Sequence, residues 1–153
     1  MRIIFDMDGT LNRFYDFPNW LERIRAHDAS PYRKAAPMWD MKRLAAAIRK
    51  AQAAGISFSV VSWLSKEPHK VFDHDTRVAK REWLDQFDFP SDEIHLVKYG
   101  TTKANCTRKL GGYQIIVDDN ESVRNGWSLG ATIDANEDIL PYLYELIFKE
   151  LTK

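Results

Sequence analysis

The chain has 153 residues, of which 22 are basic and 22 acidic, so its formal net charge at pH 7 is zero. This balance argues against a protein that depends on bulk electrostatic attraction to nucleic acid or to an anionic membrane. A single cysteine excludes an internal disulfide. No stretch approaches the roughly 20 apolar residues of a membrane span, and the start lacks a signal-peptide pattern. We therefore expect a cytoplasmic protein with no membrane partner and one domain over residues 1–153, its oligomeric state left open.

Short apolar runs alternate with helical patterns along the chain. The apolar runs predict strands near residues 3–5, 56–61, 94–97, 113–117 and 131–133. Helical spacing predicts helices over 41–48 and 71–87, short helices from 101 or 102 and over 121–127, and a last helix from 138 or 139 to the end. Strands that alternate with helices predict an α/β fold, a doubly wound parallel sheet of the Rossmann-like kind.

Residues 12–39 interrupt this alternation directly after the first predicted strand. The segment is rich in aromatic residues, and Trp20, Leu21 and Ile24 have the spacing of one short helix. A crossover helix would be expected only a few residues after the strand, so we interpret the segment as an insertion above the strand end. Two interpretations stay open: a surface loop with its own small aromatic cluster, or a small cap that closes over a ligand.

The predicted helix over 71–87 carries both apolar and charged residues. We expect Val78, Leu84 and Phe87 to lie in the core. The charged residues between 77 and 82, Lys80 among them, are expected to form the solvated face of the helix.

Polar side chains follow three of the predicted strands at the point where each strand ends. Asp6 and Asp8 follow the first strand, Ser62 follows the second, and Asp118 and Asp119 follow the fourth. The carboxyl ends of parallel strands meet at one edge of the sheet, where ligands bind. Four carboxylates there would repel one another unless a cation shared the site, and oxygen ligands suit Mg²⁺. The sequence therefore predicts a magnesium site at this edge.

Such a site could cleave a phosphate ester. An ionised carboxylate at Asp6 could attack phosphorus and form an aspartyl-phosphate, while the carboxyl of Asp8 exchanges protons with the leaving group and with water. Gly9 allows a tight turn at this point, and Thr10 offers a hydroxyl and an N–H group. Ser62 could hold a phosphate oxygen, and a lysine is needed to offset the negative charge.

These residues resemble the motifs of the haloacid dehalogenase (HAD) superfamily phosphatases. The run Asp-Met-Asp-Gly-Thr-Leu at 6–11 resembles the first motif, Val-Val-Ser at 60–62 the second, and Ile-Ile-Val-Asp-Asp-Asn at 115–120 the fourth. Their order and spacing cover nearly the whole chain. The resemblance implies a Mg²⁺-dependent phosphoric monoester hydrolase with a HAD core.

The resemblance also implies a role for each matching residue. Asp6 would be the nucleophile and a metal ligand, and Asp8 the acid/base, with its backbone carbonyl on the metal. Asp118 would bind the metal directly, and Asp119 would be either a second ligand or an outer partner of the ion.

The phosphate group would be held by a separate set of residues. Ser62, Gly9 and Thr10 would form part of this set, although Thr10 is better suited to steadying the loop. For the lysine of the third motif, Lys103 at a predicted helix start is favoured over Lys98 at the end of the third strand.

Three functions remain open at this level. The first is hydrolysis of a small phosphate ester such as a nucleotide, because the arrangement resembles the 5′(3′)-deoxyribonucleotidases and an aromatic insertion could stack a base. The insertion is shorter than the cap of that family. The second is a polynucleotide 3′-phosphatase, because residues 113–133 also resemble bacteriophage-type end-healing enzymes. The third is a non-catalytic binding module on the same fold, although such a module would be expected to lose Asp6 or the Asp118–Asp119 pair.

Overall fold

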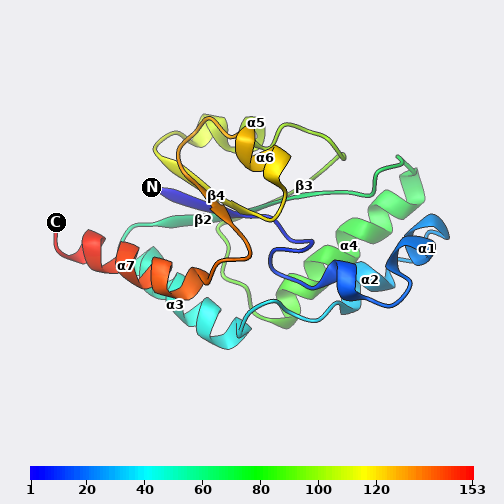
Figure 1. The fold of residues 1–153 in the computed structure, drawn as a ribbon, viewed down its shortest axis with the longest axis horizontal. Helices are drawn as coiled ribbons and strands as arrows, with labels where there is room; N and C mark the ends of the chain where they lie inside the picture. The colour runs from blue at the N-terminus through cyan, green and yellow to red at the C-terminus, as the bar shows by residue number, and fades with distance from the viewer.

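The computed structural model describes all 153 residues as a parallel sheet with helices on both faces (Figure 1). The five strands have the spatial order β3-β2-β1-β4-β5 and are all parallel. They span Arg2–Phe5 (β1), Ser57–Trp63 (β2), Glu93–Val97 (β3), Gln114–Asp118 (β4) and Thr132–Asp134 (β5). The predicted doubly wound α/β fold is confirmed.

The helices follow the predicted alternation with the strands. They span Trp20–Arg25 (α1), Ser30–Lys34 (α2), Met41–Ala53 (α3), Lys70–Gln86 (α4), Lys103–Thr107 (α5), Glu121–Asn125 (α6) and Ile139–Leu151 (α7), with short 3-10 helices at Phe14–Asp16 (η1) and Arg108–Leu110 (η2). Side chains that accept backbone N–H groups fix several starts, such as Asp40 before α3 and Asp138 before α7. No helix has the length and apolar character that crossing a membrane requires.

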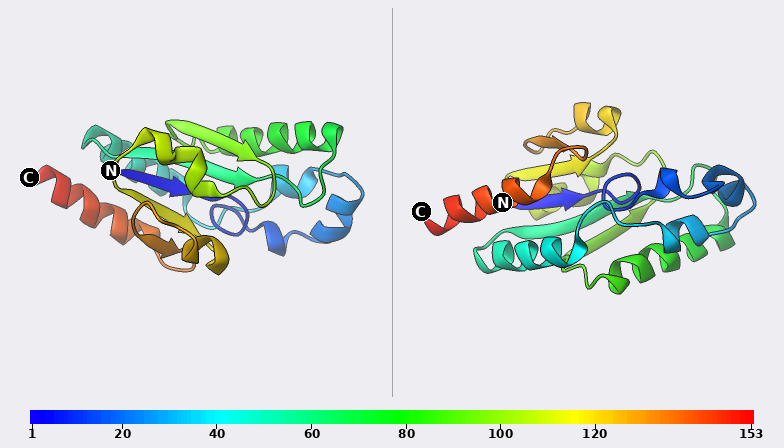
Figure 2. Two further views of the ribbon diagram at one scale, coloured as in Figure 1. Left: turned by 90° about the horizontal axis from the view of Figure 1, so that it is seen from above. Right: turned by 60° about the horizontal axis from the view of Figure 1, so that its bottom comes forward.

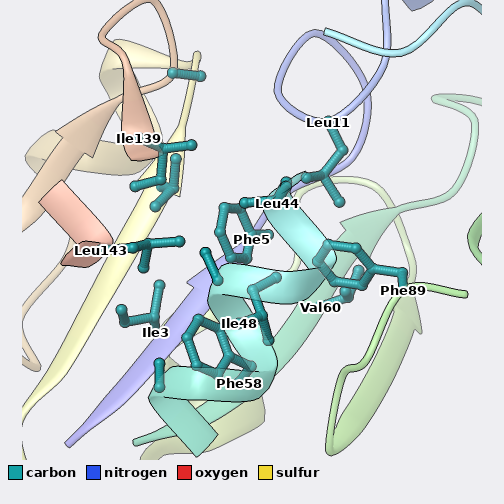
Figure 3. Close-up of a cluster of buried hydrophobic side chains, with 14 of the residues drawn as sticks. Ile3, Phe5, Leu11, Leu44, Ile48, Phe58, Val60, Phe89, Ile139 and Leu143 are labelled. Atoms are coloured by element: carbon teal, nitrogen blue, oxygen red, sulfur yellow. The ribbon is translucent and has the colours of Figure 1, made fainter. Parts of the chain in front are cut away.

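The two faces of the sheet are covered by different helices, as the views from two directions show (Figures 1 and 2). Ile3 and Phe5 of β1 are fully buried in the larger core, together with residues of α3 and α7 (Figure 3). Residues of α4 belong to the same core. Ile4 points to the opposite face, where it belongs to a smaller cluster that residues of α5 and α6 cover. This alternation is the two-residue period of a strand buried on both faces.

The pairing register places the end of β1 level with the ends of its neighbours. Phe5 pairs with Val60 of β2 on one side and with Val117 of β4 on the other. The residue that follows Phe5 is Asp6, and the residue that follows Val117 is Asp118. The strand register thus brings these two carboxylates to the same edge of the sheet.

Residues 12–39 contain η1, α1 and α2 and pack against α4 beyond the carboxyl ends of the strands (Figure 1). Phe14 and Tyr32 stack with ring centroids 4.8 Å apart and share a small buried cluster with Phe72 and Ala79 of α4. An aromatic cluster, as in the first of the two interpretations of this segment, is therefore present, and it is shared with α4.

The expected orientation of α4 is wrong at two positions. Lys80 is fully buried, whereas Val78 is 36% exposed. The buried stripe of the helix instead comprises Phe72, Thr76, Ala79, Lys80, Trp83 and Leu84. This stripe has the three- and four-residue spacing of a buried helix face, and Lys80 lies in its middle.

Candidate active site

The loop after β1 makes a tight turn that is held by its own backbone. The N–H groups of Thr10, Leu11 and Asn12 all lie within 3.2 Å of the carbonyl oxygen of Met7. Gly9 has φ +77°, a left-handed conformation that glycine adopts without steric cost. A Cβ atom at Gly9 would also meet Oδ2 of Asp119, so any other residue here would displace that carboxylate or the loop. The turn keeps Asp6 and Asp8 at the strand end.

Three carboxylates meet at this edge of the sheet. Asp6, Asp118 and Asp119 each offer an oxygen, and these atoms lie within 4.8 Å of one another. Asp6 and Asp118 are buried, and Asp119 is half-buried. A set of oxygen donors carrying this much negative charge fits a hard divalent cation such as Mg²⁺.

Lys103 lies between two of these carboxylates. Its Nζ donates to Oδ1 of Asp6 at 2.9 Å and to Oδ2 of Asp118 at 2.7 Å, and the lysine is 5% exposed. Lys103 is the first residue of α5, which directly follows the turn after β3. Lys98, the other candidate, is exposed and makes no ion pair. The structure thus brings Lys103 and not Lys98 to the carboxylates.

The crowding of negative charge shifts the pKa values of the cluster. Burial and repulsion from Asp6 raise the pKa of Asp118 to about 6, although Lys103 acts in the opposite direction. Burial and repulsion from Asp6 and Asp118 raise the pKa of Asp119 to about 7. Burial alone would lower the pKa of Lys103, but its two carboxylate partners raise it above the ordinary value. The lysine therefore stays charged and leaves the cluster with excess negative charge.

Asp8 does not belong to this carboxylate cluster. Its Oδ2 accepts a hydrogen bond from Nζ of Lys80 at 2.9 Å. Burial raises the pKa of Asp8, even though the charge of Lys80 opposes this shift. Asp8 is therefore set apart from the other three carboxylates in both position and partner.

Ser62 is fully buried and accepts a hydrogen bond from the same Lys80 Nζ at 2.7 Å. Its side chain does not line the cavity described below, whereas Ser65, three residues further on, does. The assignment of Ser62 to phosphate binding stays a prediction, and Ser65 is a second serine that could serve this purpose.

Thr10 links the loop to the carboxylates from a fully buried position. Its hydroxyl lies 3.2 Å from Oδ2 of Asp6 and 3.3 Å from Oδ1 of Asp119, and it accepts the N–H of Asp119 at 3.2 Å. The indole N–H of Trp39 donates to the Thr10 carbonyl at 2.9 Å. Thr10 therefore has the position of a residue that steadies the loop.

A cavity of about 430 Å³ opens above the carboxylates. Asp6, Asp8, Lys103, Asp118 and Asp119 form its polar side. Six aromatic side chains also line it, beside aliphatic residues such as Leu21 and Ile24 and further polar ones such as Ser65 and Lys66: Phe14, Tyr15, Trp20, Tyr32, Trp63 and Tyr99. Four of the six come from the insertion 12–39, so this segment contributes directly to the wall of the cavity.

Sequence reasoning missed several of the residues that build this site. Lys80 could have been found, because it falls four residues after Thr76 and three before Trp83 on the buried stripe of α4. Trp63 and Tyr99 carry no such signal. They reach the cavity because β2 and β3 are neighbours in the sheet, and their rings lie 4.9 Å apart.

Comparisons with known proteins show likeness at the level of the fold. No family model matches the sequence, and no curated protein matches it. A chain of the solved "Pnkp1/Rnl/Hen1 complex" superposes with a TM-score of 0.58 at 15% sequence identity, over 88% of this chain and 45% of that one. A target protein from Vibrio cholerae has a TM-score of 0.47 at 20% identity, over 97% and 98% of the two chains. This chain thus spans less than half the length of the first structure, and the two share a fold.

Proposed function

We propose that the chain is a Mg²⁺-dependent phosphomonoester hydrolase of the HAD type. The observation that carries this proposal is the meeting of Asp6, Asp118 and Asp119, whose oxygens lie within 4.8 Å of one another beside the buried Lys103. A cluster of carboxylates with one cation among them is suited to binding a second cation and, through it, a phosphate group. The fold shared with a chain of the Pnkp1/Rnl/Hen1 complex is compatible with a phosphoesterase.

The metal would be held by the carboxylates of Asp6, Asp118 and Asp119 and by the backbone carbonyl of Asp8. When bound, Mg²⁺ would neutralise charge on the phosphate and so make phosphorus more open to attack. Asp119 can serve as a direct ligand or through a water molecule, since Mg²⁺ commonly keeps several waters.

The protein's own residues would then carry two chemical steps. In the first, a carboxylate oxygen of Asp6 forms a bond to phosphorus, and the ester P–O bond breaks as the leaving oxygen takes a proton from Asp8. In the second, Asp8 takes a proton from water as that water attacks phosphorus, which releases phosphate and restores the Asp6 carboxylate. Lys103 would offset the charge between the nucleophile and the phosphate.

The walls of the cavity favour a substrate with a flat ring. Six aromatic side chains line a volume of about 430 Å³, which is within the usual range for small-molecule sites. Aromatic side chains bind planar groups by offset or edge-to-face contact. A nucleoside monophosphate meets both conditions, with its phosphate on the carboxylates and its base among the aromatic rings.

A polynucleotide 3′-phosphatase is the second candidate. Tyr15 and Tyr99 line the cavity and are each about half exposed, so the aromatic wall reaches the molecular surface where a strand end could enter. Stacking on exposed aromatic rings is a common way to hold single-stranded nucleic acid. A non-catalytic binding module is disfavoured, because Asp6, Lys103 and the Asp118–Asp119 pair are all in place.

A phosphatase screen tests the proposed function. The purified chain, with Mg²⁺ or with EDTA, is incubated with p-nitrophenyl phosphate, nucleoside 5′- and 3′-monophosphates, sugar phosphates and a 3′-phosphorylated oligonucleotide. We expect Mg²⁺-dependent release of phosphate, highest with a nucleoside monophosphate. Metal binding without turnover of any ester would support the binding module instead, and the oligonucleotide as best substrate would support the second candidate.

A further inference from the structure

Lys80 is a buried cation that no step of the proposed reaction uses. Its Nζ donates three hydrogen bonds: to Oδ2 of Asp8 at 2.9 Å, to Oγ of Ser62 at 2.7 Å and to the carbonyl of Trp63 at 2.9 Å. A lysine ammonium has three N–H donors, so these acceptors use all of them. The ring of Tyr32 lies 4.8 Å from the same nitrogen. The ammonium group is therefore fixed in position on every side.

The two buried lysines of the site divide the carboxylates between them. Lys103 bonds to Asp6 and Asp118, whereas Lys80 pairs with Asp8 and with no other carboxylate. The side chain of Lys80 is fully buried, and that of Asp8 is 17% exposed. Burying an ammonium group is costly unless a carboxylate is beside it, so each partner of this pair depends on the other.

Lys80 is the cation that donates a hydrogen bond to the Asp8 carboxyl. Oδ2 accepts this hydrogen bond, while Oδ1 is buried, and the Asn12 side chain lies near the same carboxyl. Lys80 is therefore the one cation that is paired with this carboxyl. Asp8 itself lies outside the cluster of three carboxylates that could bind a metal ion.

We infer that Lys80 is a positioning residue, which holds the Asp8 carboxyl apart from the metal ligands and in place to exchange a proton with the leaving oxygen. This inference rests on the proposed function and adds a residue to its mechanism. Lys80 does not line the cavity, so it acts through Asp8. Lys80 joins α4 to the end of β2 through Ser62 and Trp63, and to the loop after β1 through Asp8.

The leaving group of the substrate separates this role from a merely structural one. A nucleoside 5′-monophosphate has an alkoxide leaving group that needs a proton, whereas p-nitrophenolate leaves with little help. We expect Lys80→Met to lower kcat/KM for both esters unequally. The loss for the nucleotide should be about ten times the loss for p-nitrophenyl phosphate, or more. Arg81→Met, at the exposed neighbouring position of α4, should leave both values unchanged. Equal losses on the two esters would overturn the inference.

A double variant tests whether Lys80 acts through Asp8. The rate of Asp8→Asn on p-nitrophenyl phosphate is the reference. Asp8→Asn/Lys80→Met should be no slower than this reference, because the effects of substituting two residues that act as a unit do not add. A further loss of about tenfold would contradict the inference. This comparison also serves if Lys80→Met alone does not fold, since the double variant leaves no unpaired carboxylate. A wild-type chain inactive on both esters would instead overturn the proposed function, and with it the role of Lys80.

Discussion

Nζ of Lys103 lies 2.9 Å from Oδ1 of Asp6, although the two residues are 97 positions apart in the chain. The contact exists because β1 and β4 are neighbours and α5 precedes β4, so that the helix start lies over the ends of both strands. The lysine also bonds to Asp118 and is nearly fully buried. Its charge is the counter-charge that the protein itself provides for these two carboxylates.

Replacement of Lys103 by methionine should cost both stability and activity. The change leaves Asp6 and Asp118 buried without their shared cation, and breaking a buried pair in this way costs about 3 to 5 kcal/mol. Chemical denaturation at pH 8 measures the loss. Lys98→Met is the matched control, because that lysine is exposed, and its effect should stay within about 0.5 kcal/mol. Equal effects of the two variants would contradict the assignment of Lys103.

Some residues of this site could be predicted from the sequence, and others could not. Asp6 and Asp118 could be placed from the sequence, because each directly follows the apolar run of a strand and strand ends of a parallel sheet converge. Asp8 could be placed near them, because it comes two residues after Asp6. The position of Lys80, the ion-pair partner of Asp8, was harder to predict. It depends on which face of α4 is buried, and Lys80 was expected on the solvated face because charged residues rarely lie in a core unpaired.

The arrangement of the insertion 12–39 could also be predicted only in part from the sequence. Its aromatic content predicted a cluster, and a cluster is present around Phe14 and Tyr32. The contact of that cluster with α4 is set by the tertiary packing of residues about 50 positions apart in the chain, which no local pattern encodes. The wall that Trp63 and Tyr99 add to the cavity likewise depends on strand order.

Asp6→Asn and Asp8→Asn should separate attack from proton transfer. Asp6→Asn removes the nucleophile and should lower turnover of p-nitrophenyl phosphate by roughly three orders of magnitude or more. Asp8→Asn should retain Mg²⁺ affinity, because the proposed ligand there is a backbone carbonyl, but lose most turnover of alkyl esters. Calorimetric titration with Mg²⁺ beside steady-state kinetics measures both effects. If Asp8→Asn loses Mg²⁺ binding and excess metal restores its activity, the assigned roles are wrong.

The metal-free protein should be less stable at pH 8 than at pH 5. The pKa values of Asp118 and Asp119 are raised to about 6 and about 7, whereas an unfolded chain has an aspartate pKa of about 3.9. Between these limits the folded state binds more protons than the unfolded state, so stability falls as the pH rises through the raised values.

Thermal unfolding in EDTA at the two pH values measures this difference. Added Mg²⁺ should raise Tm at pH 8 more than at pH 5, because the ion binds the folded state and competes with protons for the same oxygens. A Tm in EDTA that rises from pH 5 to pH 8, or a Tm that does not respond to Mg²⁺ at pH 8, would count against the carboxylate cluster as a metal site.

Tyr99→Ala should weaken the hydrolysis of a substrate with an aromatic ring. Tyr99 lines the cavity and is 51% exposed, so its removal should leave the fold intact. Loss of one ring contact is worth about 0.5 to 1.5 kcal/mol, which corresponds to a rise in KM of about two- to tenfold for a nucleoside monophosphate. KM for ethyl phosphate should not change. Tyr144→Ala on α7 is the control, and a rise in KM for both esters would argue against contact with the base.

Gly9→Ala should damage the site as well as the fold. At φ +77° an alanine is strained by about 1 to 2 kcal/mol, and its Cβ would press on Oδ2 of Asp119 and lie 2.9 Å from the Tyr15 ring. Gly55→Ala is a matched control, because Gly55 has φ +94° but nothing within 4 Å of an added Cβ. We expect both variants to lose similar stability in chemical denaturation, while Gly9→Ala alone loses phosphatase activity and Mg²⁺ affinity. Full activity in Gly9→Ala would show that Asp119 can move without consequence, and would remove that residue from the proposed site.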